Sequence, residues 1–123
     1  MITSSVCFQF KKEDIKLKIE GQCYIYTCDY RVPRVTACPY FDGHFPGRPI
    51  LPGVAIIDAS LEYVRTIQDS PGLEIQGATS IKFLDLVGPD SFVELNAFKK
   101  GSDWIVIWLA NKKKAAEIIF VLY

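Results

Sequence analysis

Two side chains suited to proton transfer lie 14 residues apart near the middle of the chain. His44 is the only histidine, and its side chain naturally titrates near neutral pH, so it can take a proton from a substrate. Asp58 lies within the apolar run Val54-Ala-Ile-Ile-Asp-Ala59. Apolar surroundings favour the neutral, proton-donating form of a carboxyl group. A base near neutrality and an acid that keeps its proton together predict proton transfer to and from a bound substrate.

A stiff segment joins these two residues. It reads His44-Phe-Pro-Gly-Arg-Pro-Ile-Leu-Pro-Gly53, and its prolines restrict the backbone up to the expected start of a helix at Gly53. The first N–H groups of a helix have no acceptor within the helix, and the helix dipole favours negative charge there. The Gly53 N–H is therefore placed to polarise a substrate carbonyl, and the missing Cβ lets a substrate approach the backbone closely.

Apolar periodicity predicts the elements that position these residues. Apolar residues at helical spacing predict a helix over residues 53–68, and its first half is apolar on nearly all sides, so we expect it to be buried. Alternating and β-branched segments predict strands at 15–19, 23–28, 75–84, 92–98, 104–109 and 115–123. Short turns favour antiparallel pairing of the last three or four strands. The predicted fold class is α+β, with one central helix and a single domain over residues 1–123.

The composition excludes several classes of protein. Apolar residues make up 50% of the 123 residues, which is typical of a folded domain with a core. Fourteen basic and 14 acidic residues balance, so no net charge attracts nucleic acid or an anionic membrane. The four cysteines and the single histidine lack the spacing of a zinc site. No apolar stretch is long enough to span a membrane, and the first residues do not resemble a signal peptide. We therefore expect a cytoplasmic protein with free thiols, no metal, and no membrane or nucleic-acid partner.

Each candidate residue also has a structural interpretation. A lone histidine in a loop is often a surface residue, and an acid in an apolar helix can be a hydrogen-bonded core residue. Gly53 can start the helix after Pro52 without binding anything. Glu62, four residues after Asp58 and on the same helix face, can be a solvated side chain.

Taken together, these residues resemble the signature of one enzyme family. The loop His44–Gly53 followed by Asp58 is similar to the 3-hydroxyacyl-(acyl-carrier-protein) dehydratases of the FabZ and FabA types. Ile81-Lys-Phe-Leu-Asp-Leu-Val-Gly-Pro-Asp90 resembles the first long strand of that family and the turn after it. A similar pattern occurs in dehydratase-like proteins of aryl polyene clusters. The resemblance covers roughly residues 30–100 and is most specific over residues 41–62.

The resemblance implies a hotdog fold, in which an antiparallel sheet wraps around the helix, and a homodimer with sites at the subunit interface. His44 of one subunit would take the α-proton of a (3R)-3-hydroxyacyl thioester, and Asp58 of the other would protonate the departing hydroxyl. The Gly53 amide would hold the thioester carbonyl. Further residues are assigned to substrate binding: Phe45, Pro52, Val54 and Glu62. The substrate would arrive on acyl carrier protein and leave as a trans-2-enoyl thioester, in fatty acid or related acyl-chain biosynthesis, and no cofactor is implied.

Two positions depart from the FabZ pattern, which has Glu at the position of Asp58 and usually Gln at that of Glu62. Asp at the first position also occurs in the FabA type. A carboxylate four residues from Asp58 either helps to keep Asp58 protonated or disturbs the site. Two alternative functions stay open. One is a thioesterase of the same fold, and the other is a carrier-protein or acyl-binding subunit without turnover.

Overall fold

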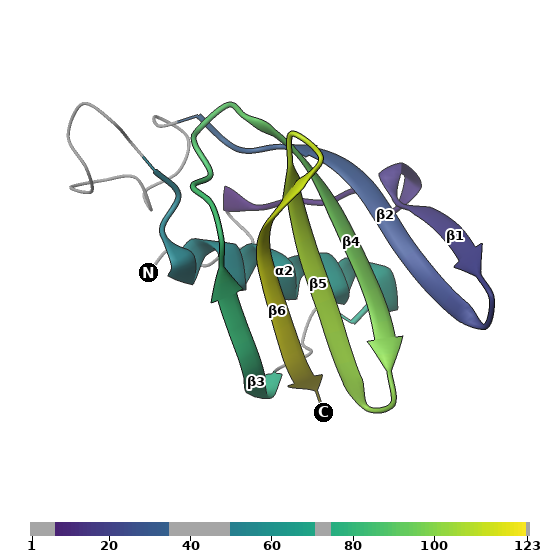
Figure 1. Ribbon diagram of the computed structural model, residues 1–123. Helices are drawn as coiled ribbons and strands as arrows, with labels where there is room; N and C mark the ends of the chain where they lie inside the picture. The colour runs from purple at the N-terminus through teal and green to yellow at the C-terminus, as the bar shows by residue number, and fades with distance from the viewer. Residues whose placement is uncertain (1–6, 35–49, 71–74, 123) are drawn as a thin grey trace.

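The computed structural model describes residues 7–34, 50–70 and 75–122. His44 and Phe45 lie outside these residues. Six strands form one antiparallel sheet in the order β1-β2-β4-β5-β6-β3 (Figure 1). The bounds of the elements are η1 Lys12–Asp14, β1 Lys16–Glu20, β2 Cys23–Arg31, α2 Gly53–Gln68, β3 Ile75–Phe83, β4 Phe92–Lys100, β5 Asp103–Ala110 and β6 Lys113–Leu122.

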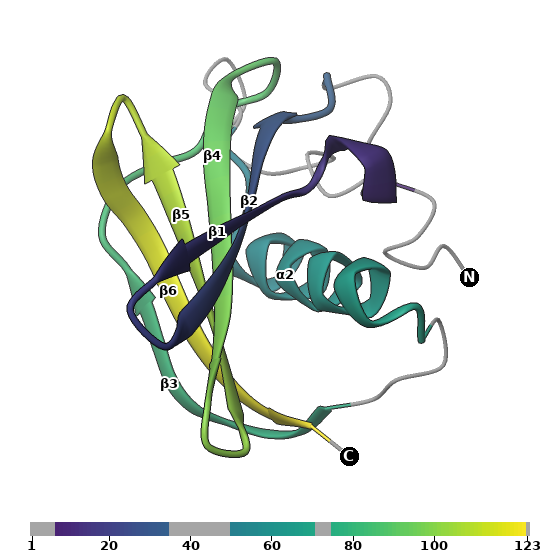
Figure 2. The same cartoon turned by 90° about the vertical axis from the view of Figure 1, so that its right-hand side faces the viewer.

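Helix α2 lies on the concave side of the curved sheet, as Figure 2 shows. This is the arrangement of a hotdog fold, so the predicted α+β class is confirmed. The helix has the predicted bounds. Pro52 is its N-cap residue in an extended conformation, and Asp69 ends it in the left-handed conformation with φ 53°. The Ser70 N–H donates to the Arg65 carbonyl at 3.0 Å, which satisfies a carbonyl in the last turn.

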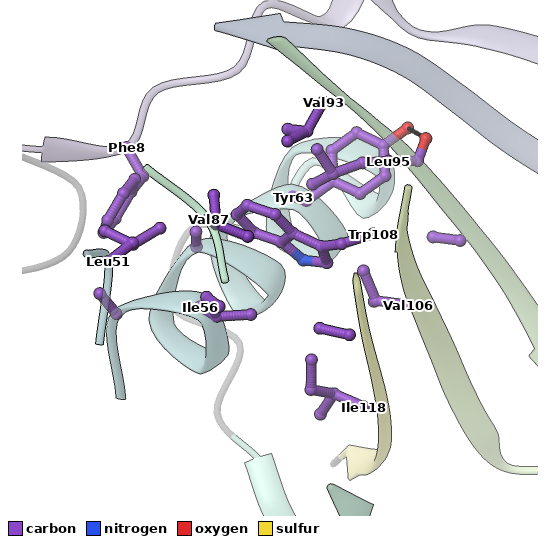
Figure 3. Packing of buried hydrophobic residues seen from close by; sticks show 14 of the residues in the cluster. Phe8, Leu51, Ile56, Tyr63, Val87, Val93, Leu95, Val106, Trp108 and Ile118 are labelled. Atoms are coloured by element: carbon purple, nitrogen blue, oxygen red, sulfur yellow. Dashed lines mark hydrogen bonds between the residues drawn. The ribbon is translucent and has the colours of Figure 1, made fainter. Parts of the chain in front are cut away.

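One side of α2 is fixed against the sheet by two buried polar side chains. The Ser60 hydroxyl donates to the Ile56 carbonyl at 2.7 Å and accepts from Trp108 Nε1 at 2.8 Å. The Tyr63 hydroxyl donates to the Tyr26 carbonyl at 2.9 Å. Figure 3 shows the Trp108 indole lying between helix and sheet among the buried apolar side chains. These contacts set the rotation of the helix about its axis.

The expectation that the first half of α2 is buried on nearly all sides is wrong within one chain. Val54 is 57% exposed, and Ile57 and Leu61 are only half-buried. The reason is geometric, because a single sheet covers one side of a helix and leaves the other side open. The uncovered side of α2 therefore carries apolar side chains.

Within the described residues, Cys23 and Cys28 are free thiols. Burial, together with the nearby Asp14 and Asp29 carboxylates, raises the pKa of the Cys28 thiol from 9.0 to about 11. Cys28 is therefore an unreactive core thiol near neutral pH.

A tight turn joins β5 to β6 at Asn111 and Lys112. Both residues have positive φ, 53° and 64°, as a type I′ hairpin turn requires. The Cβ atom of a lysine disfavours positive φ, so the backbone is strained at Lys112.

Candidate active site

The start of α2 is tied to the segment that follows β3. The Leu51 N–H donates to the Val87 carbonyl at 2.7 Å, and both side chains are buried. Figure 3 shows these two residues close to Ile56 and Phe8 at the same end of the helix. The Ala55 and Ile56 N–H groups donate to the Pro52 carbonyl, so the first turn is regular from its first residue.

Gly53 lies directly beneath the ring of Phe83, the last residue of β3. A Cβ added at Gly53 would lie 2.6 Å from Phe83 Cε2 and 2.7 Å from Phe83 Cζ. The missing Cβ at Gly53 therefore leaves room for the Phe83 ring, which would have to move if a larger residue stood there. The Gly53 N–H lies in the first turn, where helix geometry supplies no acceptor.

Asp58 lies about one and a half turns into α2, on the side that the sheet does not cover. Its side chain is half-buried within one chain. Val54 and Leu61 are four residues before it and three after it, so they flank it on the same helix face. Two apolar side chains therefore share the face of Asp58, on a side of α2 that is partly open to solvent.

Glu62 forms an ion pair with Arg65. Arg65 Nη1 lies 2.7 Å from Glu62 Oε1, and the side chains are only 20% and 16% exposed. The Thr66 hydroxyl donates to the Glu62 carbonyl at 2.8 Å. A hollow of about 210 Å³ runs along these residues to Asp69. Glu62 is therefore a paired, partly shielded carboxylate.

Exposed apolar side chains occur on β3, on the segment that follows it and in the first turn of α2. We call these five side chains the β3 patch: Val54, Ile81, Phe83, Leu84 and Leu86. Ile81 and Phe83 lie on the side of β3 that faces the helix, because they pair with Ile118 and Ala116, whose side chains are buried. β3 is also the last strand at its end of the described sheet (Figure 1). An apolar patch at a strand with one open side is a surface suited to association.

Of the predicted site residues, Gly53, Val54, Asp58 and Glu62 lie on α2, and Pro52 is its N-cap residue. Sequence reasoning missed two of their neighbours. Phe83 gave no signal beyond its place in a predicted strand. Arg65 stands three residues after Glu62, and that spacing is typical of a helical ion pair.

A larger hollow of about 740 Å³ does not belong to this site. Its lining includes Asp29, Glu94 and Leu109. Glu94 and Leu109 alternate with the buried residues Leu95 and Trp108, so this hollow lies on the face of the sheet turned away from α2. Within the described residues, no three His, Cys, Asp or Glu side chains are grouped to hold a metal ion. None of the described helices is long and apolar enough to span a membrane.

The fold is a hotdog fold. A family model of ApeI dehydratases matches residues 16–118. The chain belongs to this ApeI-like dehydratase family, and the sequence resemblance is thereby confirmed.

Relatives and solved structures agree with this assignment. The FabZ 3-hydroxyacyl-(acyl-carrier-protein) dehydratase of Thermus thermophilus is 31% identical over 98 residues, 68% of this chain and 69% of that protein. The FabZ protein of Anaplasma phagocytophilum is 38% identical over 68 residues, which cover 53% of this chain and 46% of the relative. The match therefore spans about half of that relative.

A chain of the dehydratase heterocomplex ApeI:P from Xenorhabdus doucetiae aligns with TM-score 0.65 at 22% identity, over 87% of this chain and 93% of that chain. A protein of Erwinia carotovora subsp. atroseptica aligns with TM-score 0.67 at 23% identity, over 88% and 90% of the two chains. At these identities the structural matches show the fold.

Proposed function

We propose that this protein dehydrates 3-hydroxyacyl thioesters carried by acyl carrier protein, at sites that two hotdog subunits form together. The observation that carries the proposal is the uncovered side of α2. It presents the half-buried acid Asp58 on the same helix face as Leu61 and as Val54, which is one member of the β3 patch. A second subunit seated on the patch would exclude water from Asp58 and complete the site.

The proposed reaction needs one base and one acid. His44 takes the α-proton of the substrate, and the electron pair of the broken Cα–H bond forms the double bond between Cα and Cβ. The Cβ–O bond breaks, and Asp58 gives its proton to the departing hydroxyl, which leaves as water. His44 then releases its proton to solvent and Asp58 takes up a proton from solvent, so both residues return to their starting state.

The Gly53 N–H has a separate part in the proposal. Removal of the α-proton places negative charge on the thioester carbonyl oxygen, and a donor at a helix start stabilises that charge. Pro52 fixes the direction of the chain into this turn. Phe45, Val54 and Phe83 would provide apolar contacts to the substrate.

The nature of the second subunit has two candidates. A second copy of this chain is the simpler one, since the net charge of zero opposes no self-association. The Xenorhabdus doucetiae relative belongs to a dehydratase heterocomplex, which favours a related but different hotdog chain as the second candidate. Native mass spectrometry distinguishes the two candidates. It is applied to the protein purified alone and to the protein purified after co-expression with a related hotdog chain.

The test is turnover by purified protein of 3-hydroxyacyl carrier-protein thioesters of several chain lengths, followed by mass spectrometry. We expect loss of one water to give the enoyl thioester. His44→Ala and Asp58→Asn should each lower kcat at least about 100-fold while thermal unfolding shows that both variants are folded. Ser102→Ala, in the exposed β4–β5 turn, is the matched control and should match wild type.

Other outcomes identify the alternatives. Full activity in both site variants would refute the assigned roles. Release of free thiol from an acyl thioester without a hydroxyl group indicates a thioesterase. Carrier-protein binding without exchange of the substrate α-proton indicates a subunit that binds but does not turn over.

A further inference from the structure

The uncovered side of α2 carries a row of charged side chains. Asp58, Glu62, Arg65 and Asp69 follow each other at intervals of four, three and four residues, so they lie on one face of the helix. The first three are half-buried, whereas Asp69 is exposed. The charges nearest the proposed acid are therefore those least screened by water.

The Glu62–Arg65 pair differs from the pair at the far end of this row. Lys12 also pairs with Asp69, but those side chains are 58% and 74% exposed. Glu62 and Arg65 are 16% and 20% exposed and lie 2.7 Å apart. Opposite charges so close produce a weak field at a distance, because each largely cancels the other. The pair thus presents little net charge to Asp58, one turn before it.

We propose that Arg65 is a positioning residue that neutralises Glu62, so that this position acts on the site as an uncharged amide would. The inference rests on the proposed dehydration. Negative charge grows on the substrate carbonyl when the α-proton leaves, and an unpaired carboxylate one turn from Asp58 would oppose it. Arg65 removes that penalty, which explains how a carboxylate is tolerated at residue 62.

The experiment measures kcat/KM with the carrier-protein substrate that wild type turns over. It compares wild type with four variants: Arg65→Gln, Glu62→Gln, the double variant of these two, and Arg65→Lys. Arg65→Gln should lower kcat/KM about tenfold, because it leaves Glu62 unpaired. Adding Glu62→Gln should restore it to within about twofold of wild type. Arg65→Lys keeps the charge and should keep most of the activity. Lys114→Gln breaks another i,i+3 pair, with Glu117 on β6, and should leave kcat/KM unchanged.

The rescue distinguishes this role from a purely structural one. If Arg65 acts only through the fold or through another contact, Glu62→Gln cannot restore activity, and an equally slow double variant overturns the inference. Wild-type activity in a folded Arg65→Gln overturns it as well. If Arg65→Gln does not fold, the decisive comparison is kcat/KM of the double variant against that of Glu62→Gln alone. Without a carboxylate at residue 62, the loss of Arg65 should leave kcat/KM unchanged. A wild-type protein without dehydration overturns the proposed function itself, whereas an active wild type with no rescue overturns only the role of Arg65.

Discussion

Removing the Ser60 hydroxyl should destabilise the protein by a predictable amount. Ser60 and Trp108 are both fully buried, at 0% exposure, and Trp108 Nε1 donates to Ser60 Oγ at 2.8 Å. Ser60→Ala leaves that N–H without a partner, which costs about 1–3 kcal/mol. Alanine favours the helix by about 0.5 kcal/mol relative to serine. The expected net loss in unfolding free energy is therefore about 0.5–2.5 kcal/mol.

Urea denaturation followed by tryptophan fluorescence measures this loss directly. For a chain of 123 residues, 1 kcal/mol corresponds to about 4 °C in Tm, so thermal unfolding should show a fall in Tm of about 2–10 °C. Ser102→Ala in the β4–β5 turn is the control and should change Tm little. In a Trp108→Phe background, which has no N–H to leave unpaired, Ser60→Ala should cost about 1 kcal/mol less. An equal cost in both backgrounds would refute the role of this hydrogen bond.

Three further predictions concern Gly53, Lys112 and Cys28. Gly53→Ala should lower the unfolding free energy by about 1 kcal/mol, because displacing Phe83 outweighs the gain in helix propensity. Adding Phe83→Leu should recover part of the lost stability. A double variant no more stable than Gly53→Ala would contradict the contact between Gly53 and Phe83. Lys112→Gly should raise the unfolding free energy by about 0.5–1 kcal/mol, because glycine adopts positive φ without strain. The urea midpoint of this variant should therefore be higher than that of wild type. A lower midpoint would contradict the turn type. The stability of wild type should fall as pH rises through the interval from 9.0 to about 11, since the Cys28 thiol ionises near 9.0 only in the unfolded chain. Denaturation across this interval should show a smaller loss for Cys28→Ala, and an equal loss would argue against Cys28.

The sequence predicted the elements of this fold well because their periodicity is local. The helix over residues 53–68 was predicted to the residue, since Pro52 and the turn after Gln68 mark its ends. The six strands were predicted as well, although β2 runs to Arg31 and β4 to Lys100, beyond their apolar cores. Strand ends are set by pairing with neighbours, and single-strand patterns do not contain that information.

The site was predicted less completely, because its contacts are not local. Gly53 was interpreted as leaving room for a substrate, and that stays a prediction. The sequence did not show that Phe83, 30 residues later in the chain, lies where a Cβ of residue 53 would be. The pairing of Glu62 with Arg65 depends on rotamers as well as spacing. The roles of His44 and Phe45 remain predictions from the motif, since both lie outside the described residues.

The two anchors on the covered side of α2 have a consequence for how such a protein changes over time. Ser60 and Tyr63 hold the helix through Trp108 and the Tyr26 carbonyl, and none of these contacts uses the uncovered side. Substitutions at outward positions such as Val54, therefore, leave the orientation of the helix unchanged. Outward residues can therefore be exchanged one at a time with foldability preserved at each step.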